Sequence, residues 1–194
     1  GPVKAGDRLV ARIEKVGSAP GVFDHAKLDW LNALWIRQTP AERLADLVGS
    51  FWVSAGVDPA VVEARGRAWL GGAIPLFVER AKTLVDLARA MAFLFARSIV
   101  HEPKAAEKFL TARHLANLAA VRRVAAETAD FSTEGLEQQV RALAEQGGGK
   151  LIDYAQPIRV ALTGTTASPP IFPVLVLLGR EAVLARLDGA LGAR

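Results

Sequence analysis

Helix-start signals recur along this chain at intervals that leave room for one helix each. Asp24 and Ser132 each precede a segment of helical periodicity and carry a side-chain oxygen that can cap free helix amides. Thr39-Pro40-Ala41-Glu42 adds a proline at the first helical position and a glutamate at the third, and Asp58-Pro59 repeats the first part of that signal. No alternating run of strand length and no repeat period is present. The pattern predicts an all-α fold.

Composition supports this prediction, because 51% of the residues are hydrophobic and alanine and leucine dominate among them. We expect helices over residues 7–16, 25–37, 40–56, 59–70, 74–80, 82–97, 104–110, 112–129, 133–146 and 179–191. All four tryptophans lie in the first half of the chain. They are predicted to be core residues, namely Trp30, Trp35, Trp52 and Trp69.

The segment 156–172 carries two helix signals and a corner between them. Pro157 is expected to open a short helix that Gly164 ends as a C-cap, and Ser168 followed by proline is expected to start the next helix. Arg159 would then lie beside free helix amides, which is a place for phosphate or base edges. Local physics alone favours the plainer alternative, a helix–turn–helix corner with a solvated arginine.

Several classes of site are excluded or unsupported. The chain has no cysteine, so disulfides, thiolate metal sites and a cysteine nucleophile are excluded. No apolar run reaches the roughly 18–20 residues that a membrane span needs. The three histidines are not spaced as metal ligands, and no phosphate-loop, dinucleotide or nucleophile-elbow motif occurs. We expect no metal, no membrane partner and no catalysis in this chain, and a cytoplasmic location.

Three segments, in order along the chain, resemble signatures of bacterial glutamyl-tRNA synthetases. Residues 22–32 resemble "VFD-x-x-KL-x-W-x-N", and residues 80–84 match "RAKTL". Residues 156–181 are similar to "QPLRVALTG…SP…LLGKE". The resemblance runs from about Leu9 to the end of the chain. It departs from the family pattern at Pro170, where glycine is common, at Phe131, where tryptophan is common, and in the glycine-rich residues 147–149.

This resemblance implies the family's anticodon-binding region, two packed α-helical subdomains of the α-helix cage type. We expect a leader over residues 1–21, where Gly1-Pro2 is typical of a tag-protease scar, a helical subdomain over 22–118 and a C-terminal anticodon-binding subdomain over 119–194. The family's ATP-binding "HIGH" and "KMSKS" elements are absent. The resemblance thus assigns ATP, Mg²⁺ and the joining of glutamate to the rest of a parent enzyme. It implies tRNA(Glu) as partner and no cofactor for this chain, which we expect to be a monomer.

The resemblance also assigns roles to residues. Arg80 matches an arginine that reads the third anticodon base, which is C in glutamate tRNA and G in glutamine tRNA. An arginine here, rather than glutamine, is similar to family members that charge only glutamate tRNA. Positions that line the pocket for the anticodon bases are matched by Arg159, Ser168, Pro169 and Ile171.

Basic side chains are distributed along the whole chain, which has a net charge of +4. Lys27 matches a position of RNA-backbone contact in the family, and Arg37 and Lys150 are further candidates. Whether such charges share one wall of the molecule is open at this point. Three other interpretations also remain: a helical protein–protein adaptor, a free-standing enzyme, and the same domain of a non-discriminating synthetase that also accepts tRNA(Gln).

Overall fold

The computed structural model describes residues 24–192. The α-helices are α1 (His25–Gln38), α2 (Ala41–Val48), α3 (Pro59–Arg65), α4 (Arg67–Ala73), α5 (Leu84–Met91), α6 (Pro103–Phe109), α7 (Ala112–Glu127), α8 (Thr133–Gln146), α9 (Ile152–Thr163), α10 (Ile171–Leu178) and α11 (Arg180–Leu191). Short 3₁₀ turns occupy Gly49–Phe51, Val53–Ala55, Ile74–Leu76, Val78–Arg80 and Ala92–Phe95. No strand occurs between residues 24 and 192, so the all-α prediction is confirmed. The expected helix 7–16 and leader 1–21 lie outside the described residues.

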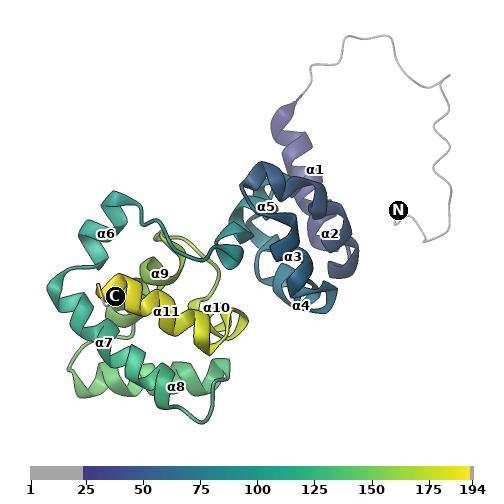
Figure 1. Ribbon diagram of the computed structural model, residues 1–194. Coiled ribbons are helices and arrows are strands. Elements are labelled where there is room, and N and C mark those ends of the chain that lie inside the picture. Colours follow the sequence, from purple (N-terminus) through teal and green to yellow (C-terminus); the bar gives the residue numbers. More distant parts are fainter. Residues whose placement is uncertain (1–23, 193–194) are drawn as a thin grey trace, which may run out of the picture.

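The helices form two packed groups, α1–α5 and α6–α11, joined by residues 96–102 (Figure 1). In the N-terminal group α2 packs against α4 and α5, and in the C-terminal group α7 packs against α9 and α11. Two packed helical subdomains are therefore present, as expected. The division of the chain into 22–118 and 119–194 stays a prediction, and residues 118 and 119 both lie within α7.

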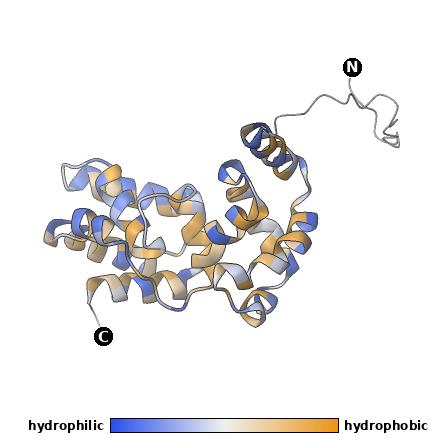
Figure 2. Cartoon of the chain, turned by 90° about the horizontal axis from the view of Figure 1, so that it is seen from above, coloured by the Kyte–Doolittle hydropathy of each residue, from blue (hydrophilic) through white to orange (hydrophobic). Residues whose placement is uncertain are grey.

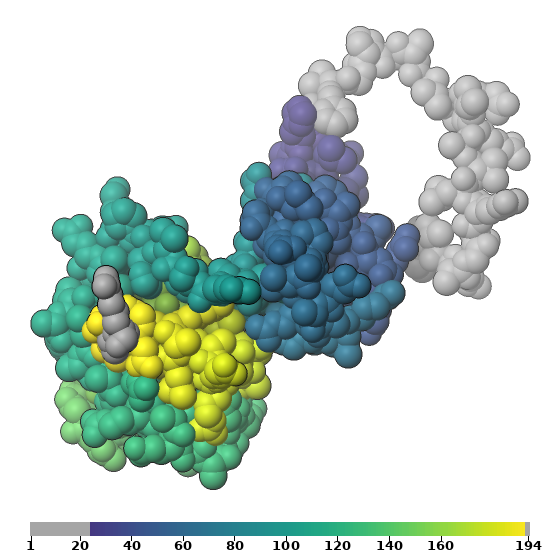
Figure 3. Space-filling model, viewed as in Figure 1, coloured from purple at the N-terminus to yellow at the C-terminus, as the bar shows by residue number. Residues whose placement is uncertain are grey.

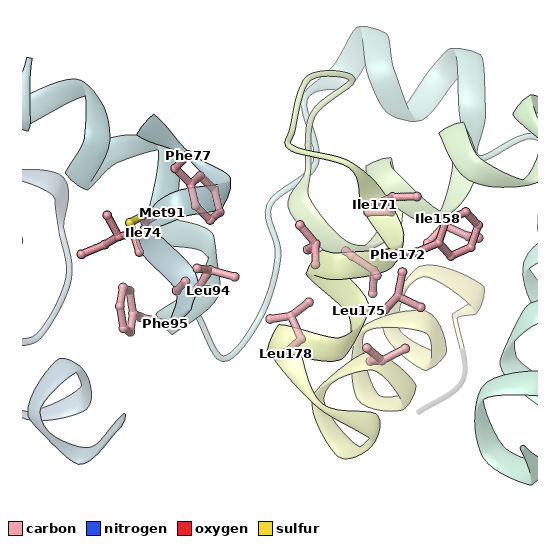
Figure 4. Packing of buried hydrophobic residues seen from close by; sticks show 14 of the residues in the cluster. Ile74, Phe77, Met91, Leu94, Phe95, Ile158, Ile171, Phe172, Leu175 and Leu178 are labelled. Carbon is pink, nitrogen blue, oxygen red and sulfur yellow. The ribbon is translucent and has the colours of Figure 1, made fainter. Parts of the chain in front are cut away.

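The two groups share one apolar cluster. Most helices have a hydrophobic side and a hydrophilic side (Figure 2). The two groups meet at a narrow junction, which we call the waist (Figure 3). Phe95 contacts the rings of Trp52 and Trp69 edge-on, at centroid distances of 5.0 and 5.8 Å. Trp69 Nε1 donates a hydrogen bond of 3.2 Å to the carbonyl of Leu177 in α10. Figure 4 shows this cluster approaching the waist from both sides, with Leu178 in the C-terminal group.

Arg186 of α11 forms hydrogen bonds across the waist. Its guanidinium donates to the carbonyl of Leu162 at 2.8 Å and to those of Phe93 and Ala96 at 2.8 and 2.9 Å. The side chain is buried, and burial, followed by the positive charge of Arg65, lowers its pKa to about 10. Three carbonyl acceptors compensate this buried cation, because each one points a partial negative charge at it.

Some helix starts follow their predicted local signal, and others do not. Asp24 Oδ1 accepts from the amides at positions 26 and 27, and Ser132 Oγ accepts from Gly135, so both predicted caps are confirmed. The predicted capping box at Thr39 is wrong, because α2 has Pro40 as its N-cap residue and no side-chain cap. The Thr39 hydroxyl instead donates to the Trp35 carbonyl of the preceding helix at 2.7 Å.

Pro157 lies inside α9 and does not open it, contrary to prediction. A proline there leaves the carbonyl four residues earlier, that of Asp153, without its helical donor. The side-chain amide of Asn117 in α7 supplies the missing donor at 3.1 Å. Helix α9 therefore continues through its proline because a neighbouring helix satisfies the freed carbonyl.

The expected helix 82–97 is also shorter than predicted, since α5 ends at Met91 and a 3₁₀ turn follows. Two of the four tryptophan predictions are wrong: Trp30 and Trp35 of α1 are 59% and 48% exposed. Helix α1 has two buried residues, Ala33 and Ile36, and packs against the turn Val78–Arg80.

Candidate nucleic-acid interface

Gly164 shapes the corner between α9 and α10. It has φ +82°, and its amide donates to the carbonyl of Val160 at 2.8 Å, so the predicted C-cap is confirmed. Its carbonyl accepts from the amide of Glu102 at 2.8 Å. A Cβ at this position would overlap the Val100 carbonyl oxygen and lie 3.1 Å from Ile99 Cγ2. Only glycine fits here, and it sets the path of the connection 165–170.

A cavity of about 260 Å³ lies between this corner and the N-terminal group. Its lining comes from both groups: Phe77, Arg80, Arg89, Ala90 and Phe93 from one, and Thr163, Thr165, Ala167, Ser168 and Pro169 from the other. The rings of Phe77 and Phe93 lie 6.1 Å apart and supply apolar surface. Lining of this kind suits a flat aromatic group that is bonded along its edge.

Arg80 and Ser168 meet directly in this cavity. Arg80 Nη1 donates to the Ser168 carbonyl at 3.1 Å, across 88 residues of sequence. Ser168 is buried, and its hydroxyl donates to the carbonyl of Pro169 at 2.8 Å. The prediction that Ser168 caps the next helix is wrong, because α10 begins at Ile171 with Pro170 as its N-cap residue.

Arg159 does not line the cavity, but the positive charge of Arg80 acts on its guanidinium. Burial, and then the positive charge of Arg80, lowers the pKa of Arg159. Its Nε is buried and has no hydrogen-bond partner among the described residues. Two arginines therefore converge on this corner, and a ligand with acceptor atoms or negative charge would relieve their repulsion.

Ile171 has a different position from the other predicted pocket residues. It is buried at the start of α10, belongs to the apolar core, and is not part of the cavity lining. The expected donors at 168–171 are also few, because Pro169 and Pro170 have no amide hydrogen. Apolar contact in the cavity comes from Phe77 and Phe93 instead.

A second cavity of about 410 Å³ lies on the other side of Arg80. Trp30, Arg37 and Lys82 are part of its lining, together with Arg80 itself. The fold thus brings the backbone candidate Arg37 next to the predicted base reader. The candidates Lys27 and Lys150 are exposed but lie outside both cavities, the first on α1 and the second between α8 and α9.

Seven of the ten lining residues were not predicted as site residues, and the aromatic and charged ones among them are Phe77, Arg89 and Phe93. The spacing of the two phenylalanines in the sequence does not show whether they line a cavity or belong to the core. Arg89 was one of many basic side chains on helices, and only its position nine residues after Arg80 on the adjoining helix could have marked it.

Metal and membrane features are absent from the described part of the chain. Between residues 24 and 192, no group of three or more histidine, aspartate and glutamate side chains is placed to hold a metal ion. No helix in the same range is both long and apolar enough to cross a membrane.

Comparisons with known proteins bear on the family and the fold of this chain. The family model described as "Anticodon binding domain" matches residues 43–191. The chain is 37% identical over 184 residues to glutamate–tRNA ligase 1 of Syntrophus aciditrophicus, covering 94% of this chain and 38% of that protein. It is 41% identical over 184 residues to glutamate–tRNA ligase 2 of Rhizorhabdus wittichii, covering 91% of this chain and 37% of that protein. The chain therefore spans less than two fifths of these curated relatives.

A solved structure shares the fold. The crystal structure of a glutamate tRNA ligase from Elizabethkingia meningosepticum superposes with a TM-score of 0.76. That match covers 94% of this chain and 35% of the other chain, at 20% sequence identity. The two-group helical architecture is thus found in a known synthetase.

Proposed function

The chain belongs to the anticodon-binding domain family, and from this premise we propose that it reads the anticodon of tRNA(Glu) for a glutamate–tRNA ligase. Joining glutamate to the tRNA with ATP and Mg²⁺ would belong to the remainder of a longer, cytoplasmic parent protein. This chain by itself would act as a monomeric binding module without catalysis. Similarity to glutamate–tRNA ligases over 94% of the chain does not favour the adaptor interpretation.

The Arg80–Ser168 cavity is the observation that carries this proposal. Anticodon bases are unstacked, so a protein can hold each one against apolar surface and bond its Watson–Crick edge. Phe77 and Phe93 offer the apolar surface, and Arg80 offers planar donors that remain after its bond to Ser168. Cytosine presents acceptors on its pairing edge where guanine presents donors, so a donor at this point favours C.

A titration of the chain with tRNA tests the proposal. Glutamate tRNA should bind about tenfold more tightly than the same tRNA with its third anticodon base changed from C to G. Affinity should fall steeply as salt rises, because phosphate contacts release counterions. Equal binding of both forms would contradict discrimination and leave the non-discriminating interpretation. Absence of binding to either form at low salt would reject anticodon reading by this chain.

Arg80→Gln should abolish most of the C-over-G preference. The substitution removes the guanidinium donors while it leaves the phosphate contacts in place, so affinity for the C form should fall about tenfold and affinity for the G form should change little. Filter binding or fluorescence titration with both tRNAs measures this ratio. Arg123→Gln on α7 is the matched control, since Arg123 is exposed and is not part of the cavity lining. An unchanged ratio in Arg80→Gln would remove the base-reading role from Arg80.

A further inference from the structure

Arg89 is the cavity residue that the proposed function has not used. It lies in the last turn of α5, its side chain is exposed, and it lines the same cavity as Arg80 and Ser168. Among the described residues, its side chain has no hydrogen bond or ion pair. An exposed guanidinium without a protein partner, held at the wall of an apolar cavity, is available for a ligand.

The carboxylate nearest to Arg89 along α5 is engaged elsewhere. Asp86 precedes Arg89 by one helical turn, which is a spacing that allows an ion pair. The Asp86 carboxylate instead accepts from the backbone amide of Thr83 at 3.0 Å, and the Thr83 hydroxyl accepts from the Asp86 amide at 3.0 Å. This capping box fixes Asp86 at the start of the helix.

The charged residues that line the cavity are all of one sign. Its lining contains Arg80 and Arg89 and no carboxylate. Arg159 adds a third positive charge, since its pKa is lowered by burial and then by Arg80. Arg80 donates to a carbonyl of the corner, whereas Arg89 has no such acceptor. Like charges at a ligand-sized cavity favour an anionic ligand group, and the anion of a nucleotide is its phosphate.

Building on the anticodon-reading function, we propose that Arg89 binds the backbone phosphate of the nucleotide whose base enters the Arg80–Ser168 cavity. Arg80 and the phenylalanine rings hold the base, and Arg89 holds the phosphate. The cavity is then a site for one complete nucleotide. Arg80 recognises which base is present, and Arg89 positions the RNA backbone through a contact that does not depend on the base. A forked guanidinium suits two phosphate oxygens at once.

Arg89→Gln tests this assignment in the full chain, with the C and G forms of glutamate tRNA titrated across several salt concentrations. Binding of both forms should weaken about fivefold at low salt while their ratio stays unchanged. The slope of log affinity against log salt should become shallower by about 0.7, as expected for one lost phosphate contact to a single strand. Arg89→Lys should retain the slope and lose part of the affinity, because it keeps the charge without the fork.

Arg123→Gln is the matched control, and it should leave affinity and slope at wild-type values. A role of Arg89 confined to stabilising the C-terminus of α5 predicts a lower melting temperature and an unchanged slope. That result, or an Arg89→Gln slope equal to that of Arg123→Gln, overturns the inference. A changed C-to-G ratio would overturn it too, because it would assign Arg89 to the base. Failure of the wild-type chain to bind either form at low salt is a separate outcome, which rejects the proposed function and this inference with it.

Discussion

Replacing Gly164 by alanine is expected to lower the free energy of unfolding by about 3 kcal/mol. The backbone there has φ +82°, which an L side chain rarely adopts. The added Cβ would also overlap the carbonyl oxygen of Val100. Movement of the corner cannot relieve the overlap cheaply, because the Gly164 carbonyl is bonded to the amide of Glu102 at 2.8 Å. Urea unfolding measures the loss.

Gly148→Ala separates the two causes in this prediction. Gly148 also has positive φ, at +64°, but a Cβ there would meet nothing within 4 Å. Its loss should therefore be only about 1 kcal/mol, the cost of the backbone conformation alone. If both variants lost the same amount, the contact with residue 100 would contribute nothing. Arg80→Gln should lose no more than about 1 kcal/mol in the same assay, because it removes one hydrogen bond, to the Ser168 carbonyl.

Arg186→Met is expected to lower the free energy of unfolding by about 3 kcal/mol as well. The methionine preserves much of the apolar stem but leaves the carbonyls of Leu162 and Ala96 without this donor, and that of Phe93 with the amide of Ala96 alone. Removing the buried cation recovers part of this loss, since its desolvation no longer opposes folding. Because the bonds cross the waist, the variant should also unfold over a broader range of urea concentration than wild type.

Arg123→Met on the exposed face of α7 is the comparison for Arg186→Met. A surface substitution of this kind should change stability by no more than about 0.5 kcal/mol. Equal stability of the two variants would show that the three carbonyls find other donors or water. The free energy of unfolding of Arg186→Lys should lie between those of the two methionine variants. The lysine ammonium keeps the charge, but it cannot reach acceptors in both groups as the planar guanidinium does.

Helix starts and ends were predictable where they depend only on neighbouring residues. Asp24, Ser132 and Gly164 act through atoms two to four positions away, so the sequence contains the whole signal. The start of α9 was not predictable in this way. Pro157 lies mid-helix because Asn117, on another helix, bonds the carbonyl that the proline ring leaves free. A local rule cannot include a donor that arrives through folding.

The same limit applies to burial. Apolar residues at helical spacing identified α1, but they could not show how much of its circumference is covered. Only the face of Ala33 and Ile36 is buried, and the side chain of Asn32 donates to the carbonyl of Lys82 at 2.7 Å beside it. The exposure of Trp30 and Trp35 follows from this single, narrow contact.

For the site, family resemblance identified residues that local reasoning could not. Arg80 and Ser168 are separated by 88 residues, and nothing in either segment predicts that one donates to the other. The resemblance matched both to anticodon contacts, and the fold brings them together. It did not identify Arg89, Phe77 or Phe93, which complete the cavity only because the waist places α5 and its neighbouring turns opposite the corner. The roles of all these residues in RNA binding stay predictions.

The hydrogen bond from Arg80 to Ser168 also affects the entropy of recognition. An unrestrained arginine loses up to about 2 kcal/mol of rotamer freedom when it is fixed in one conformation. Here the carbonyl of a buried serine already restrains the guanidinium when the chain has folded and no ligand is present. The loss of rotamer freedom therefore occurs during folding and not when RNA binds. More of the free energy of each new contact then contributes to affinity. The side chain that we propose to discriminate between bases is preorganised by the fold.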